Sequence, residues 1–416
     1  MKPSILLALA FAGVFGIAVA GHAAEPLRLD QAVSRSLAAN PTLLAGVADV
    51  RAAKARADRD SLPAPYVIGG DVENVVGTGS VGGFTSAETT LRLGRVIELG
   101  GKRAARQAAG AAEVARQQNA ADIARLEIAA RTTTRFIKVV ADQQRLAFAS
   151  EQVTLAEKTR REVAGWVRAA RNPETDLHAA EIAVFDAELE REHAEHELAS
   201  ARVTLAASWG SPTPDFETVA GNLDELPTSA PLAVLAQRLP QSIAQHTSQL
   251  ESQVIAARRN LAIAASHPDV NVSVGVRRQE VLDDQGLVMS VSVPLGNKAR
   301  SRLGIAEADA QLDAVQARRD TQRVESHQAL YEKYQELVHA RTEYDAVSIR
   351  MLPKAEQASA FSRRGFAAGR FSFTQLAQAQ RTLVQLRERR VEAAARYHTL
   401  FADIERMTAT ATEDYP

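Results

Sequence analysis

Small and apolar residues recur at helical spacing along residues 101–170, a stretch that contains no proline. Positions three and four apart form one stripe, which indicates an amphipathic helix with an alanine-rich seam at Ala105, Ala108, Ala112, Ala115, Ile123, Leu126, Ala130 and Ile137. At 1.5 Å per residue this helix would be roughly 105 Å long. Residues 298–368 predict a second helix of this kind, with a kink at Pro353. Such lengths predict a coiled coil rather than a globular core.

Shorter helical stretches predict the return path of each long helix. Residues 174–209 and 232–266 flank a segment rich in proline and glycine, 210–231, and together they match the length of the first long helix. For the second long helix we expect residues 371–407 and, from the beginning of the chain, residues 29–61 as antiparallel partners. The chain would therefore contribute four helical columns of equal height.

Alternation of apolar and polar residues predicts two β-hairpins, a clear one at 270–295 and a weaker one at 66–99. In the clear hairpin, Val270, Val272, Val274 and Val276 alternate with Asn271, Ser273, Gly275 and Arg277. Strands of about ten residues with one apolar face are typical of membrane barrels, and the alternative is a pair of hairpins in a periplasmic sheet. Four strands cannot close a barrel, and open strand edges do not occur in lipid. Insertion would therefore require an oligomer, and three copies would supply twelve strands.

The order of these elements occurs twice, and so do several of the residues that punctuate it. Pro41 and Pro240 are separated by 199 residues, and so are Leu177 and Leu376. A repeat of this size predicts a duplicated structural unit, of the kind found in membrane transport proteins. The chain divides into a signal peptide, a first repeat, a linker, a second repeat and a frayed tail, at residues 1–23, 24–214, 210–231, 232–408 and 409–416.

The first residues predict export. A basic start, an apolar run at 5–20 and small residues at 21–24 are typical of a cleaved secretory signal peptide. The rest of the chain has no run of 18 apolar residues, so we expect no transmembrane helix. The sequence has no cysteine, which excludes disulfides and lipidation on a cysteine. The net charge of −1 argues against a nucleic-acid partner.

Three short motifs, in this order inside the double repeat, resemble the TolC-like outer-membrane factors. They are Asn40-Pro41-Thr42-Leu43, the run from Ile97 to Arg103, and the run from Phe366 to Phe373 leading into Leu376, Ala379 and Gln380. The resemblance covers essentially the whole mature chain. The Glu-Leu-Gly-Gly-Lys-Arg run at 98–103 is similar to the CzcC-like branch, which is associated with resistance to heavy metals.

The resemblance implies a membrane protein of mixed but mostly α structure, a homotrimer whose 12-stranded outer-membrane β-barrel continues into a long α-helical periplasmic coiled-coil barrel. It places the linker at 210–231 in an equatorial belt. It also implies two protein partners, a periplasmic adaptor and a proton-driven inner-membrane transporter of the RND type, and contact with outer-membrane lipid. Anchoring would rest on the barrel alone.

Two helix breaks, at 170–174 and 366–373, would form hairpin tips at the periplasmic end. Gly369 supplies the freedom that a chain reversal needs, and Ser372 or Thr175 would cap the returning helix. The resemblance implies that these tips contact the adaptor and line the closed end of the channel. Many relatives carry aspartates after the second tip, where this chain has Gln375 and Gln378. The carboxylate ring of some relatives is therefore not expected here, and a gate would rest on Arg370, Asp176 and packing, with Gln375 and Gln378 among the polar residues of the tip that repeat threefold by symmetry.

Neither a metal site nor a catalytic site is predicted. His193 and His196 are spaced for one metal ion, but a charged, solvated helix face is the favoured interpretation. The GxSxG, HExxH, P-loop and Rossmann motifs are absent from the sequence, and we expect neither an enzyme nor a cofactor. The favoured function is a passive outer-membrane export channel for heavy-metal cations. The alternatives are a duct for drugs or polypeptides, a periplasmic structural coiled coil and an exported helical enzyme.

Overall fold

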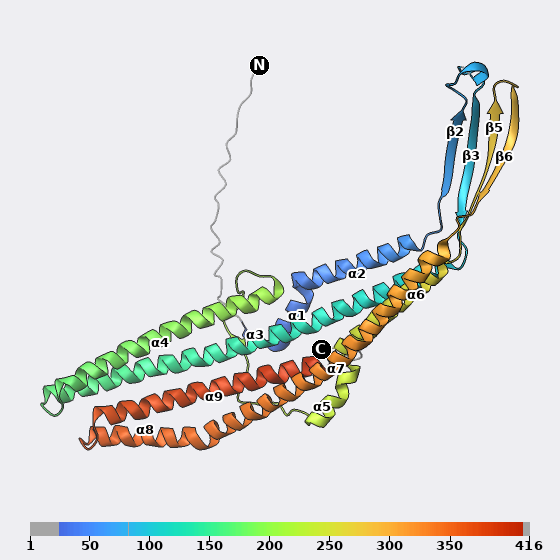
Figure 1. The fold of residues 1–416 in the computed structure, drawn as a ribbon. Coiled ribbons are helices and arrows are strands. Elements are labelled where there is room, and N and C mark those ends of the chain that lie inside the picture. The colour runs from blue at the N-terminus through green and yellow to red at the C-terminus, as the bar shows by residue number, and fades with distance from the viewer. Residues whose placement is uncertain (1–24, 82, 411–416) are drawn as a thin grey trace, which may run out of the picture.

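The computed structural model describes residues 25–81 and 83–410. The predicted signal peptide and residues 411–416 lie outside this part of the chain. In Figure 1 the helices form a long rod, and a single sheet extends from one end of it while two helical hairpins end at the other. The order helix, β-hairpin, long helix, helix occurs twice along the chain.

The first half comprises α1 (Leu29–Ala39), α2 (Pro41–Asp60), β2 (Tyr66–Glu73), β3 (Glu88–Ile97), α3 (Lys102–Arg168) and α4 (Glu174–Ala206). The second half comprises α5 (Leu232–Arg238), α6 (Ile243–Ala264), β5 (Val270–Gln279), β6 (Asp284–Ser292), α7 (Asn297–Asp345), α8 (Leu352–Ala367) and α9 (Phe373–Thr408). Short 3₁₀ turns lie at Gly79–Val81, Ala207–Trp209 and Leu239–Gln241. The helices and strands agree closely with those expected from periodicity.

Proline lies at two of the places where a helix is interrupted, between α1 and α2 and between α7 and α8. Asn40 ends α1 and caps α2, because its side-chain oxygen accepts a hydrogen bond from the N–H of Thr42 at 2.9 Å, and Pro41 occupies the first helical position. Between α7 and α8, residues Ala346–Met351 form a π-helical turn directly before Pro353. A proline removes one helical hydrogen bond and crowds the preceding turn, so the helix widens there. The irregularity expected at Pro353 is therefore confirmed.

The packing of the columns differs from the expectation in one respect. Within the chain α1 and α2 pack on α3, whereas α7 packs against α6 and α9. The prediction that residues 29–61 pair with the second long helix is therefore wrong within one chain. Small residues explain the contact, since a Cβ at Gly110 of α3 would lie only 2.8 Å from that of Ala57 in α2. The alanine-rich seam lets the two helices approach closely.

The sheet has the strand order β2-β3-β5-β6, and every neighbouring pair is antiparallel. The two predicted hairpins therefore lie side by side, joined through β3 and β5. A second, very small sheet was not expected. In it β1 (Leu27–Arg28) pairs in parallel with β4 (Val219–Ala220), which belongs to the linker.

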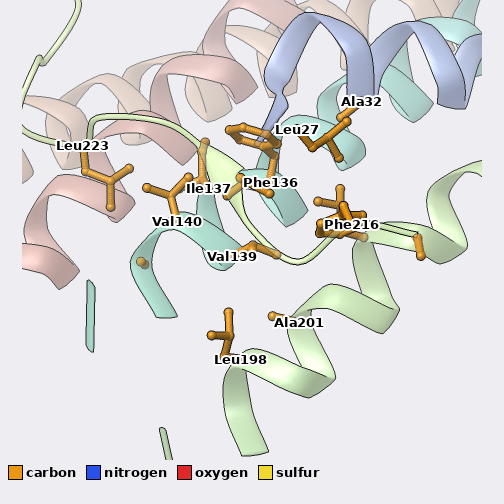
Figure 2. Close-up of a cluster of buried hydrophobic side chains, with 14 of the residues drawn as sticks. Leu27, Ala32, Phe136, Ile137, Val139, Val140, Leu198, Ala201, Phe216 and Leu223 are labelled. Atoms are coloured by element: carbon orange, nitrogen blue, oxygen red, sulfur yellow. The ribbon is translucent and has the colours of Figure 1, made fainter. Parts of the chain in front are cut away.

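The largest apolar core lies where the linker crosses the rod. Figure 2 shows Phe136 and Val140 of α3, Leu198 of α4, and Phe216 and Leu223 of the linker in this cluster. Two hydrogen bonds also join the linker to α3. The side-chain amide of Gln143 donates to the carbonyl of Val219 and accepts from its N–H. The core therefore fastens the linker to the middle of the rod.

Residues 409 and 410, the first two of the predicted frayed tail, are held in place. Ala409 is buried, and its carbonyl accepts a hydrogen bond from the N–H of Ile243 at 3.2 Å. Thr410 forms an antiparallel bridge with Ser242. The residues that follow α9 are therefore tied to the start of α6, because pairing to a neighbouring chain segment holds their backbone in place.

Candidate functional site

One face of the four-stranded sheet is apolar. The strand register puts Ile68, Leu93, Val274 and Met289 in one row across it, and all four side chains are exposed, Ile68 by 77% and Met289 by 74%. Neighbouring rows add Tyr66, Val72, Leu91, Val272, Val276, Leu287 and Val291. Two arginines share this face, Arg95 toward the helices and Arg278 toward the outer loops. The exposed apolar surface between them marks contact with lipid or with another protein.

The opposite face carries charged residues that form ion pairs across the strands. The guanidinium nitrogens of Arg277 lie 3.0 Å from a carboxylate oxygen of Glu88 and 3.1 Å from one of Glu73. Arg92 pairs with Asp71 on the neighbouring strand. The sheet thus separates an apolar face from a charged face, as expected from the alternation in the sequence.

Both edges of this sheet are open. The outer strands β2 and β6 each have one hydrogen-bonded neighbour among the described residues. Unpaired backbone groups are costly in lipid, so a sheet with an apolar face and two open edges needs further strands if it enters a membrane. None of the helices in the described part of the chain is long and apolar enough to cross a membrane.

The other end of the rod holds the two predicted hairpin tips, which close with the same hydrogen bonds. In the turn between α3 and α4, the N–H of Arg171 donates to the carbonyl of Trp166 at 2.8 Å. In the turn between α8 and α9, the N–H of Arg370 donates to the carbonyl of Gly365 at 2.9 Å. This bond, five residues back, satisfies carbonyls at the end of a helix and reverses the chain.

The residue before each of these donors is left-handed. Ala170 has φ of 57° and Gly369 has φ of 71°, and the two positions are 199 residues apart. Glycine takes this conformation without steric cost, whereas alanine is strained in it. The role assigned to Gly369 from the sequence therefore fits its backbone, and the first tip stores strain that the second does not.

An aromatic cluster joins the two tips. The ring centroids of Trp166 in α3 and Phe366 in α8 lie 4.6 Å apart in an edge-to-face arrangement, and Phe373 at the start of α9 lies 5.9 Å from Phe366. Phe366 is 3% exposed, and Val163, Ala180 and Leu376 complete the buried set. The first hairpin is therefore packed against the second at the tip itself.

The predicted caps have different outcomes at the two tips. The hydroxyl of Ser372 accepts from the N–H of Gln375 at 3.3 Å, and the side chain of Gln375 accepts from the N–H of Ser372 at 3.0 Å. This capping box confirms the role expected for Ser372. Thr175 does not cap α4, because that helix begins after Pro173 without a side-chain cap. The proline fixes the entry to the helix in place of a capping side chain.

All seven predicted tip residues lie on the two turns or in the first two turns of α4 and α9. Asp176 is half-buried, and its carboxylate accepts a hydrogen bond from the side chain of Asn172 at 2.8 Å. Gly369, Arg370, Gln375 and Gln378 are exposed. Solvent-facing polar groups at the end of the rod are available to a partner or to symmetry-related copies.

The sequence interpretation missed the aromatic cluster, although a signal was present. Aromatic residues make up only 5% of the chain, yet four phenylalanines occur within thirteen residues of the second tip, at Phe361, Phe366, Phe371 and Phe373. Aromatic side chains bury large areas, so this local enrichment indicates a packing site.

Polar side chains fasten the linker to the second half of the chain. The hydroxyl of Tyr397 donates to the carbonyl of Pro227 at 2.6 Å, and that of Tyr344 donates to the carboxylate of Asp224 at 2.9 Å. The Nε2 of His398 lies 3.1 Å from the carbonyl of Leu223. Burial lowers the pKa of His398, so the ring is neutral near pH 7. Its Nε2–H then donates a hydrogen bond to the carbonyl of Leu223.

The paired histidines of α4 lie on a solvated surface. His196 is exposed and lies 3.6 Å from Glu192, one turn away on the same helix. In residues 25–81 and 83–410 no three histidine or acidic side chains are grouped closely enough to hold a metal ion. The geometry therefore favours a charged helix face at this position.

The chain is similar to two proteins of metal resistance and to a solved channel structure. It is 31% identical over 303 residues to the cobalt-zinc-cadmium resistance protein CzcC of Cupriavidus metallidurans, with 72% of each chain covered. It is 26% identical over 308 residues to the nickel-cobalt-cadmium resistance protein NccC of Alcaligenes xylosoxydans, covering 74% of this chain and 70% of that protein. The solved structure of CusC, studied for its folding and transmembrane channel formation, matches with a TM-score of 0.77 at 14% identity over 92% of each chain. No protein-family model matches the chain.

Proposed function

Because the chain belongs to the TolC-like outer-membrane factor family, in its CzcC-like heavy-metal branch, we propose that it is the channel through which a tripartite efflux system exports heavy-metal cations. As a member of this family it is an outer-membrane protein that extends into the periplasm. The observation that carries the proposal is the likeness to CzcC over 72% of both chains.

The sheet supports a role as part of a barrel. Its apolar face would contact lipid, and its charged face would line a water-filled bore. The open edges of β2 and β6 would pair between copies, so that three chains close a barrel of 12 strands. The rod of helices below would form the periplasmic part of the same homotrimeric duct.

Transport through such a duct is passive. The proposed energy source is an inner-membrane transporter of the RND type, and a periplasmic adaptor would contact the tips at Gly369, Arg370 and Ser372. Movement of the two hairpins apart would open the bore, and Asp176, Gln375 and Gln378 are the proposed polar gate. A conduit for cations does not require tight sites, because tight binding would slow release at the exit.

The cargo is assigned from the relatives. CzcC and NccC are named for resistance to cobalt, zinc, nickel and cadmium, and on that ground we assign divalent heavy-metal cations to this chain. Drugs and secreted polypeptides are the competing cargoes. Since a duct conducts what its pump delivers, the chain itself would carry little of the specificity.

Deletion followed by growth on a panel of metals and drugs tests the proposal. We expect tolerance to zinc, cobalt or cadmium to fall and to recover on complementation with the full-length chain. Unchanged metal tolerance together with lost drug tolerance would overturn the cargo assignment. Fractionation gives a separate test, because a protein fully soluble without detergent would overturn the channel and favour a periplasmic structural coiled coil.

A further inference from the structure

Charge on the polar face of the sheet is confined to three rows near the loops that lie furthest from the helices. From the loop end inward the rows are Glu73–Glu88–Gln279–Asp284, Asp71–Thr90–Arg277–Gly286 and Gly69–Arg92–Gly275–Val288. The rows closer to the helices are uncharged on this face, with Val67, Gly94, Ser273 and Ser290 in the nearest. The four strands therefore present a charged band at the outer end and a neutral wall below it.

Each arginine of the band extends one row toward the loops. Arg277 contacts Glu73 and Glu88 of the outermost row, and its Nε donates to the hydroxyl of Thr90 at 3.0 Å. Arg92 forms its pair with Asp71 in the same manner. The strands thus hold four carboxylates and two guanidinium groups on this face, a net charge of −2 for each copy of the chain.

A glycine leaves Arg92 room to take its position. Arg92 lies between Gly69 and Gly275, and a Cβ at Gly275 would come within 2.9 Å of the Cβ of Arg92. A side chain at Gly275 would therefore crowd Arg92, which pairs with Asp71. Arg277 has Gly286 as its neighbour on β6, where a Cβ would meet no atom within 4 Å, so the position of Arg277 depends on its carboxylate partners and not on a glycine.

We propose that Arg277 is a specificity-determining residue of the channel, because it neutralises Glu73 and Glu88 and so sets how strongly the exit favours cations over anions. This inference rests on the proposed function, in which the polar face lines the bore. The side chain of Arg277 is 35% exposed, and within the four strands it is the only guanidinium that contacts both glutamates of the outermost row. Without it, the net charge of the band becomes −3 for each copy.

The magnitude follows from Coulomb's law with screening. Three symmetry-related charges roughly 12 Å from the centre of a bore would change the local concentration of a monovalent ion about 1.7-fold at 0.1 M salt. Cations and anions change in opposite directions, so the ratio of their permeabilities would change roughly threefold. At 1 M salt, where the screening length is about 3 Å, the effect would be nearly lost.

The test is the reversal potential of purified protein in planar bilayers under a KCl gradient. Arg277→Gln is expected to raise the ratio of K⁺ to Cl⁻ permeability about threefold at 0.1 M KCl and little at 1 M. The double variant Arg277→Gln with Glu88→Gln should return the ratio toward wild type, and Arg277→Lys should keep it. Arg278→Gln is the matched control, since Arg278 lies at the same height on the apolar face and pairs with Glu280 and Asp283.

The outcomes separate this inference from the proposed function. If the wild-type protein forms no channel, the proposed function fails and the inference fails with it. If the wild type conducts but Arg277→Gln and Arg278→Gln give the same ratio, only the inference is overturned. Should Arg277→Gln not assemble, Glu88→Gln decides, because it must lower the ratio of K⁺ to Cl⁻ permeability, and an unchanged ratio would reject the role of the pair.

Discussion

Replacement of Phe366 with alanine should loosen the contact between the two hairpin tips. Phe366 is 3% exposed and contacts Trp166 of the first hairpin at a centroid distance of 4.6 Å. Truncation of a buried phenylalanine costs about 3–5 kcal/mol, and each aromatic pair contributes about 0.5–1.5 kcal/mol beyond the buried area. Part of this loss falls on the packing between the hairpins, through the contact with Trp166, and part on the second hairpin, through the contact with Phe373.

A matched control is present in the same helix. The rings of Phe361 and Phe371 lie 5.3 Å apart at an angle of 59°, and both belong to the second hairpin. Phe361 is 58% exposed, so it matches Phe366 in side chain and ring contact but not in burial. Phe361→Ala therefore removes the same side chain and a comparable ring contact without separating the two tips. Only Phe366→Ala should alter the balance between a closed and an open end.

The assay is the closed-state conductance of single channels in planar bilayers, with the size of the proposed trimer in detergent as the measure of assembly. A loss of about 3 kcal/mol from the closed arrangement alone shifts its equilibrium with the open one by about 150-fold. We therefore expect frequent openings in Phe366→Ala and wild-type behaviour in Phe361→Ala. Equal conductance of the two variants, with both trimers intact, would refute the argument that this cluster holds the tips together.

Three further outcomes are expected. Met289→Arg, on the apolar face of the sheet, should lower the free energy of unfolding in lipid by about 2–4 kcal/mol, whereas Ser290→Arg, on the opposite face, should change it much less. Equal losses of the two variants in a urea titration of reconstituted protein would contradict the assignment of faces. Gln375→Ala or Asp176→Ala should raise closed-state conductance, and unchanged conductance rejects both as gate residues. Because the folded pKa of His398 lies below its unfolded value near 6.5, stability should fall as the pH drops below about 6.5; thermal melts at pH 7.5 and 5.5 should show a smaller decline for His398→Gln.

The long helices and the hairpins could be predicted because their signals are periodic. Alanines at helical spacing identify α3 over its whole length, and the alternating valines of 270–276 identify β5 and its apolar face. Proline gives the interruptions at positions 41 and 353, since its ring cannot continue a regular helix. These features are local, and local sequence determines them.

The remaining features depend on contacts between distant segments. Strand β1 has two residues, too few for a period, and its partner Val219 follows it by 192 positions. The pairing of α2 with α3 rather than α7 depends on a close approach at Gly110, and the sequence offers alanine seams on several helices. The cap expected at Thr175 was displaced because Pro173 defines the helix start instead. At the tips, the motifs and their positions in the chain predict the polar residues. They do not predict the aromatic rings that join the two hairpins, because those contacts connect distant segments.

The parallel pairing of Leu27 with Val219 has a consequence for biogenesis. A polypeptide enters the periplasm from its amino end, so Leu27 emerges long before the segment that its backbone must bind. The Thr410 bridge to Ser242 likewise waits for the last described residues to arrive. Local helical hairpins can form during secretion, whereas the pairings of Leu27 with Val219 and of Ser242 with Thr410 must form last. Until they form, the secreted chain exposes apolar surfaces that chaperones of the cell envelope would bind.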